Sequence, residues 1–223
     1  MLLNKDPFGF RKELELFKES LKPYNLSDNV KQSFYSSYKR LVLIEFLITS
    51  NPEISHKKFL KSIIYDVLNS IVSIINNRER YFQLNIRSMV EHLARISLQK
   101  IDHGEHFDIT IRLENFEYLK ENKKDENWSY LHQQYTQACS WLHSSSKVNL
   151  NINYTFNELL SSDIKTTSKR MASHLNTLTN EIIRALFCYY YNEIGNIFLR
   201  NSKELKYLIT PSGFEYFSKK YQK

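Results

Sequence analysis

The strongest constraint on the fold is the helical period of residues 81–101, YFQLNIRSMVEHLARISLQKI. Apolar residues recur there every three or four positions, which is the spacing of one face of an α-helix. Arg87, Glu91 and Arg95 are four residues apart, so the pattern predicts that they stack on one side of this helix. The predicted core side consists of Phe82, Ile86, Met89, Val90, Leu93 and Ile96.

Similar periods occur along most of the chain, and residues that form turns are scarce. The 223 residues include only 4 Gly and 4 Pro. A β-sandwich or a barrel needs many tight turns, so this composition favours long helices joined by short links. We predict helices at about 10–22, 29–49, 55–77, 81–101, 107–121, 128–144, 163–200 and 203–223.

These segments predict an all-α fold, with one helical bundle domain of six to eight helices over residues 1–223. Residues 1–27 can form a short N-terminal extension of that domain. The segment 121–127, ENKKDEN, has the composition of a solvated loop. No linker is long enough to separate two domains.

The chain carries an excess of basic residues, with a net charge of +7. Such an excess suits a polyanionic partner, RNA or DNA first. Ordinary solubility explains it equally well, because both signs of charge are mixed and no basic run is longer than a pair. The two interpretations stay open.

Neither the cysteines nor the apolar segments indicate an exported or membrane protein. Cys139 and Cys188 lie in apolar helical patterns, which is typical of small buried residues in a reduced protein. The first residues contain no apolar signal segment, and the most apolar run, 41–48, is far too short to cross a bilayer. We expect a cytoplasmic protein that does not enter the membrane.

The pair Arg87 and His92 suits the cleavage of a phosphodiester. A histidine of near-neutral pKa can move the proton of an attacking or leaving oxygen, and an arginine can hold the phosphate. In RNA the nucleophile is the adjacent 2′-hydroxyl, so this chemistry needs no metal, and Glu91 can hold the guanidinium of Arg87 in place. The structural alternative is an Arg-Glu-Arg ladder between helices, with His92 at the edge of the core.

His143 is a second candidate for the same chemistry. It lies where the predicted helix 128–144 gives way to a Ser-rich segment, and a helix C-terminus favours the cationic form of histidine. The alternative is a buried histidine bonded to a backbone carbonyl. The turn at 103–106, HGEH, is interpreted as a solvated loop, so neither a metal nor a cofactor is predicted.

An all-helical chain of this size with Arg-x4-His in an amphipathic helix resembles the HEPN superfamily. The string IRSMVEHLAR is similar to a helix of abortive-infection and toxin-type HEPN proteins, and WLHSS is similar to the end of a later helix in such proteins. The resemblance covers about twenty-five residues in two stretches, besides the helical architecture. One departure is Ser88, where active members often have Asn, Asp or His after the arginine.

The resemblance implies a metal-independent endoribonuclease that acts as a homodimer in anti-phage defence or as a toxin, beside an antitoxin or other defence protein. Arg87 would then bind the phosphate and His92 would be the general acid and base, with Glu91 and His143 as further catalytic candidates. RNA contacts are assigned to Ser88, Arg95, Ser144 and Lys147. Two alternatives remain: a non-catalytic module that binds nucleic acid or a protein, and a nucleotide sensor.

Overall fold

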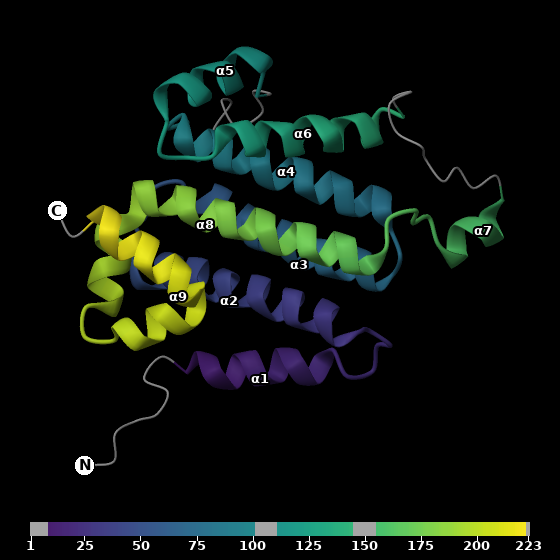
Figure 1. Cartoon of the computed structure of the whole chain (residues 1–223), viewed down its shortest axis with the longest axis horizontal. Coiled ribbons are helices and arrows are strands. Elements are labelled where there is room, and N and C mark those ends of the chain that lie inside the picture. The colour runs from purple at the N-terminus through teal and green to yellow at the C-terminus, as the bar shows by residue number, and fades with distance from the viewer. Residues whose placement is uncertain (1–8, 101–110, 145–154, 222–223) are drawn as a thin grey trace.

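The structure is a computed structural model that describes residues 9–100, 111–144 and 155–221 (Figure 1). Within these ranges the chain forms nine helices and no strands, so the predicted all-α fold is confirmed. The helices are α1 (Phe10–Ser20), α2 (Asp28–Ser50), α3 (Lys57–Ile75), α4 (Glu79–Ser97), α5 (Leu113–Asn122), α6 (Trp128–Leu142), α7 (Phe156–Ser161), α8 (Ser168–Phe198) and α9 (Ser202–Tyr221).

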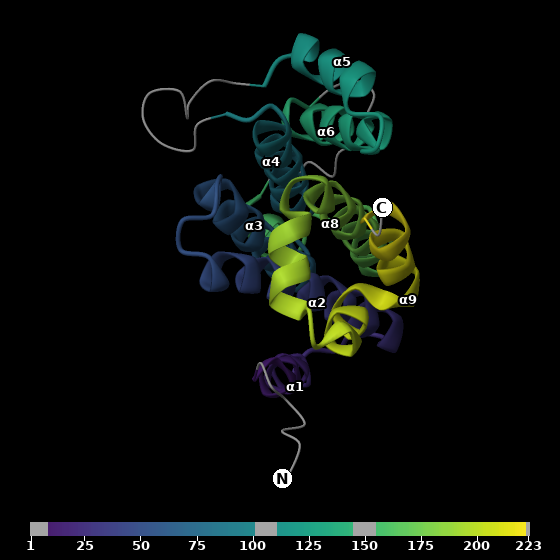
Figure 2. The same cartoon turned by 90° about the vertical axis from the view of Figure 1, so that its left-hand side faces the viewer.

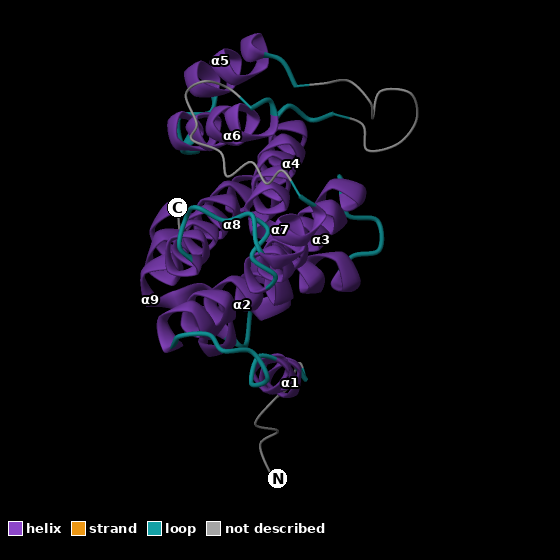
Figure 3. Cartoon of the chain, turned by 90° about the vertical axis from the view of Figure 1, so that its right-hand side faces the viewer, coloured by secondary structure: helices purple, strands orange, loops and turns teal. Residues whose placement is uncertain are grey.

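The helices form one bundle in which α4 lies between α3 and α6. Figure 1 shows α1 at one end of the bundle and α5 with α6 at the other, and the long helix α8 runs alongside α2. The same order is visible after a quarter turn in Figure 2. Figure 3, coloured by secondary structure, shows that the described chain consists of helices and the loops that join them. None of the described helices is long and apolar enough to cross a membrane.

Helix α4 occupies the segment whose period was the clearest in the sequence. All six apolar residues predicted for its core side are fully buried. The helix ends at Ser97, earlier than predicted, because Gln99 adopts a left-handed backbone conformation (φ 55°) and the amide of Lys100 bonds back to the Arg95 carbonyl at 2.9 Å. The predicted stop at His103 and Gly104 lies outside the described residues.

The N-terminal segment packs against the rest of the bundle. From Phe10 onward it contributes to the shared core, because Phe10, Leu14 and Leu21 are buried. Arg11 forms a bidentate pair with Glu204 of α9, with Nη2–oxygen distances of 2.7 and 2.9 Å. The extension at 1–27 stays a prediction, and its described part packs on the rest of the bundle.

The loop between α5 and α6 is solvated only in part. Lys124 and Asp125 are exposed, but Glu126 is buried. Its Oε2 accepts hydrogen bonds from Ser97 Oγ at 2.8 Å and Trp128 Nε1 at 2.7 Å, and its Oε1 accepts one from the Tyr189 hydroxyl. One carboxylate thus joins α4, α6 and α8, which the composition of the segment did not reveal.

The region before α8 contains a short helix that was not predicted. Thr155 and Glu158 form a capping box that starts α7, and α8 begins at Ser168 rather than near 163. Glu79, fully buried at the start of α4, accepts the amides of Lys165 at 2.7 Å and Thr166 at 2.9 Å. These bonds attach the chain entering α8 to the start of α4.

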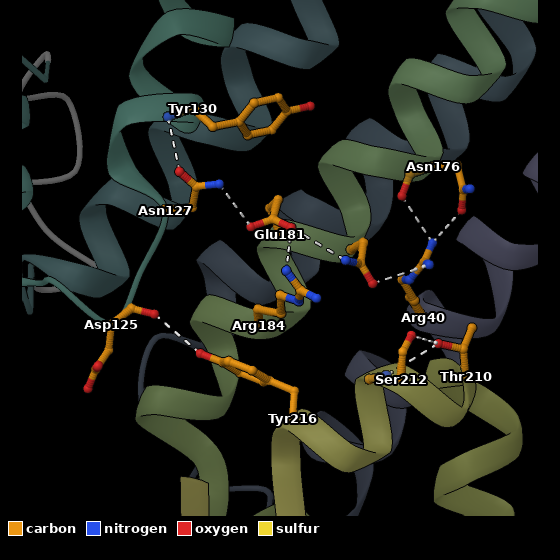
Figure 4. Close-up of polar contacts among 12 residues, drawn as sticks. Arg40, Asp125, Asn127, Tyr130, Asn176, Glu181, Arg184, Thr210, Ser212 and Tyr216 are labelled. Carbon is orange, nitrogen blue, oxygen red and sulfur yellow. Dashed lines mark hydrogen bonds and ion pairs between the residues drawn. The ribbon is translucent and has the colours of Figure 1, made fainter. Parts of the chain in front are cut away.

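A second polar network joins α8 to α2 and α6 (Figure 4). Arg40 of α2 is buried and donates through Nη1 to the Asn176 Oδ1 at 2.7 Å and to Thr179 Oγ1 at 3.1 Å. Further along α8, Glu181 accepts from Asn127 at the start of α6 at 3.3 Å and from Arg184 at 3.1 Å. The described partners of Arg40 are neutral oxygen atoms.

Candidate functional site on helix α4

The predicted ladder on α4 forms, with Glu91 between two arginines. Glu91 Oε1 lies 2.9 Å from Arg95 Nη2, and its Oε2 lies 3.9 Å from Arg87 Nη2. The side chain of Arg95 is 10% exposed, and that of Arg87 is 29% exposed. Arg95 is therefore the internal member of the ladder, and Arg87 is the member that can reach a ligand from solvent.

His92 faces α3, and it contacts the ladder through Arg95. Its Nδ1 is 3.4 Å from Arg95 Nη1, and its Nε2 is 3.2 Å from the Ser88 hydroxyl. Because a guanidinium has no acceptor atom, Nδ1 accepts in this contact and the neutral ring carries its proton on Nε2. The ring also stacks on Phe59 of α3, with centroids 6.0 Å apart.

Asp66 of α3 completes the cluster. Its Oδ2 lies 3.7 Å from His92 Nε2, and the described residues give this buried oxygen atom no hydrogen bond. Burial raises the pKa of Asp66 to about 6, against the opposing effect of the Ser88 hydroxyl. Burial, with a smaller effect of Arg95, lowers the pKa of His92 to about 4. Near neutral pH the carboxylate is thus ionised beside a neutral imidazole.

Arg87 faces α6 rather than α3. The centre of its guanidinium lies 5.7 Å from the ring centroid of Tyr135, and Tyr135 itself packs against Phe116 of α5 with centroids 4.8 Å apart. Burial raises the pKa of the Cys139 thiol one turn further along α6. Cys139 and Cys188 are both half-buried, so they are less enclosed than the sequence predicted.

The other predicted site residues do not join this cluster. His143 caps the end of α6 with an exposed side chain, and Ser144 beside it is also exposed. Arg80 donates to the Leu142 carbonyl at 2.9 Å, which places the end of α6 beside the first turn of α4. Arg80 and His92 are about 18 Å apart along the helix at 1.5 Å per residue. Lys147 lies outside the described residues.

Asp66 is the residue of the cluster that the sequence interpretation missed. It belongs to α3, and only the antiparallel pairing of α3 and α4 brings it to His92. One signal was available in the sequence. Asp66 is seven residues after Phe59 and three after Ile63, so it stands on the core side of the helix, where a carboxylate is uncommon.

No potential metal cluster of three or more His, Cys, Asp or Glu side chains occurs within the part of the chain that the structure describes. Comparison with known proteins found no matching family model, no similar curated protein and no similar solved structure. The HEPN resemblance therefore rests on the residues of this chain alone.

Proposed function

We propose that the chain is a metal-independent endoribonuclease whose reacting groups are Arg87, His92 and Asp66. The arginine holds the scissile phosphate and stabilises the charge on its oxygen atoms. In the Asp66–His92 pair, the Asp66 carboxylate accepts the proton of the attacking 2′-hydroxyl and returns it to the leaving 5′-oxygen, and the Nε2–H of His92 stabilises the charge of that carboxylate. Glu91 and Arg95 act as positioning residues, because they hold Arg87 and the imidazole in place.

The observation that supports this proposal best is the contact between His92 and Asp66. Two groups whose environments move their pKa values in opposite directions, one toward about 4 and one toward about 6, are an arrangement typical of acid–base sites. A partly exposed cation, Arg87, lies five residues before the histidine on the same helix. The proposed site therefore combines a phosphate-binding group that faces α6 with a proton-transferring pair that faces α3, and the RNA extends across α4 between them.

The test is an RNA cleavage assay with the purified protein in EDTA. Asp66→Asn, His92→Asn and Arg87→Ala should each reduce the rate by roughly 100-fold or more, since general acid–base groups contribute about 10²–10⁴. The matched control is His143→Ala, because this histidine is exposed and lies beside Arg80 at the far end of α4. It should retain the wild-type rate.

Three outcomes would contradict the proposal. Wild-type protein that leaves RNA intact with and without divalent metal would exclude the enzyme. A rate that depends on His143 and not on His92 would move the site to the end of α6. Asp66→Asn with unchanged activity would remove Asp66 from the proton-transferring pair.

A non-catalytic module that binds nucleic acid or a partner protein is the second candidate. The observation that favours it is the enclosure of His92, whose side chain is 12% exposed and whose two ring nitrogens both have partners within the chain. In that case the arginines bind without cleavage. Binding that falls steeply with salt would then identify a phosphate-contacting surface, and a flat salt response would identify a protein partner.

The remaining expectations rest on the family resemblance. We propose that the protein acts as a homodimer in the cytoplasm, in anti-phage defence or as a toxin, together with a neutralising or defence partner. Light scattering of the purified chain tests the dimer. Toxicity on expression that His92→Asn relieves would support the cellular role. A wild-type chain that cleaves RNA in the assay but is not toxic on expression would exclude a toxin.

A further inference from the structure

We propose that the cavity between the end of α1 and the start of α2 binds a small phosphorylated molecule. The cavity has a volume of about 320 Å³, within the size range of ligand sites, about 300–1,000 Å³. Figure 1 places α1 and α2 at the end of the bundle away from α5 and α6, so this site is separate from the cluster on α4. The lining residues are Lys18, Leu21, Lys22, Asp28, Lys31, Gln32 and Tyr35.

The charge of the lining decides the class of ligand. Three lysines and a single aspartate line it, so the lining favours an anion in place of Glu15 and Glu19, which pair with Lys18 and Lys22. The cavity at the start of α6 is a useful contrast. It is lined by three basic and three acidic side chains, Lys120, Lys124, Arg184, Asp125, Glu126 and Glu181, and therefore has no net charge to attract an anion.

The lysines of the cavity can exchange their present partners for a ligand. Lys18 pairs with Glu15 at 2.6 Å and Lys22 pairs with Glu19 at 2.5 Å, but all four side chains are well exposed. Exposed pairs of this kind stabilise a protein by less than about 1 kcal/mol, so a multiply charged phosphoryl group can replace the glutamates. The ammonium of Lys31, one turn into α2, completes the set.

A further cation, Lys39, packs against the aromatic ring of Tyr35, which lines the cavity. Lys39 Nζ lies 5.7 Å from the ring centroid of Tyr35 and 4.2 Å from that of Tyr207, and Lys18 Nζ lies 4.5 Å from the Tyr35 centroid. Within the described part of the chain, no acidic side chain forms an ion pair with Lys39. Burial first, and then the cations Arg40, Lys18 and Arg11, lower the pKa of Lys39 to about 8.

These cations give the region a positive potential that a bound anion would relieve. Leu21 is buried and Tyr35 is half-buried, so they supply an apolar wall beside the lysines. A phosphate monoester with a small apolar portion matches both parts of the lining, and the limited volume favours a small ligand over a polymer.

Calorimetry at low ionic strength with phenyl phosphate and inorganic pyrophosphate tests the proposal. Both probes should bind, and Lys22→Gln and Lys31→Gln should each weaken binding about threefold or more, with the double variant weakened about tenfold or more. Benzoate, which has the ring without the phosphoryl group, should bind far more weakly. The matched control is Lys12→Gln, an exposed α1 lysine outside the cavity that changes the net charge equally.

Several outcomes would overturn the proposal. They are the absence of heat at millimolar probe, equal weakening by Lys12→Gln, and equal binding of benzoate. Binding of an RNA oligonucleotide through these lysines, with no binding of pyrophosphate, would assign the surface to a polymer instead. Lys12 and Lys22 are exposed and Lys31 is half-buried, so the substitutions leave the core unchanged. Because the readout is binding, a loss of RNA cleavage does not enter the result.

Discussion

The imidazole Nε2 of His92 and the carboxylate Oδ2 of Asp66 lie 3.7 Å apart across the interface of α3 and α4. Each side chain is largely enclosed, with 12% and 11% exposure. Since enclosure favours the neutral form of both groups, the pair makes the stability of the protein depend on pH in a way that can be measured residue by residue.

Asp66→Asn should stabilise the protein above pH 7. The folded-state pKa of Asp66, about 6, is above its usual value of 3.8, so its stabilising contribution is full below pH 4 and is lost as pH rises through 6. Asparagine does not ionise. The free energy of unfolding of the variant, compared with that of wild type, should therefore be about 1–3 kcal/mol more favourable to the folded state at pH 8 than at pH 4. Urea unfolding at both values measures the difference, and a pH-independent difference would contradict it.

His92 should remain neutral at pH 6 with its proton on Nε2. Burial, aided by Arg95, lowers its pKa to about 4, so the stability that this residue contributes is present above about pH 6.5 and lost as pH falls through 4. Nitrogen NMR of the ring distinguishes the tautomers and follows the titration. Arg95→Gln should raise this pKa, and an unchanged titration would exclude the contact with Nδ1.

Glu126→Ala should destabilise the protein by about 2–4 kcal/mol, because two buried donors and the half-buried hydroxyl of Tyr189 lose their acceptor. Glu126→Gln retains one oxygen and should cost less. Denaturant unfolding followed by the fluorescence of Trp128 measures both variants. Glu121→Ala in the same segment, where the side chain is exposed, should lie within about 0.5 kcal/mol of wild type.

Arg40→Lys should cost more stability than Arg40→Met. Lysine leaves a charge buried at this position but cannot reproduce the fork that contacts Asn176, Thr179 and Asn180. Methionine removes the charge and keeps the volume of the stem, so we expect losses of about 3 and about 2 kcal/mol. Thermal unfolding gives the order, and the reverse order would mean that the charge itself stabilises the interface.

The fold could be predicted from the sequence where the spacing of apolar residues along one helix determines which side is buried. The six apolar residues of α4 sit in the core as predicted, since helix periodicity alone selects the buried side. The end of α4 was misplaced because the helix ends at Ser97, and Gln99 just beyond it takes the left-handed conformation that glycine usually adopts there. Glu126 was assigned to solvent because the residues around it in the sequence are polar. Its three hydrogen-bond donors come from α4, α6 and α8, and the composition of the loop does not reveal them.

The candidate site was predictable on one helix only. Arg87, Ser88, Glu91, His92 and Arg95 share α4, so their mutual contacts follow from spacings of three, four and five residues. Asp66 depends on how two helices pair, and a pattern within one helix carries no such information. The position of His143 also depends on how two helices pair. The end of α6 lies beside the first turn of α4, which separates His143 from His92.

The amides of Lys165 and Thr166 donate hydrogen bonds to Glu79, which attaches the chain before α8 to the start of α4. Together with the packing of α8 on α2, they hold the C-terminal part in place without using the covalent link between Ser144 and Thr155. A chain cleaved in that link should therefore remain assembled as two fragments. Fragments 1–144 and 155–223 produced separately should complement each other, so the polypeptide can be opened at this point for insertion of a reporter.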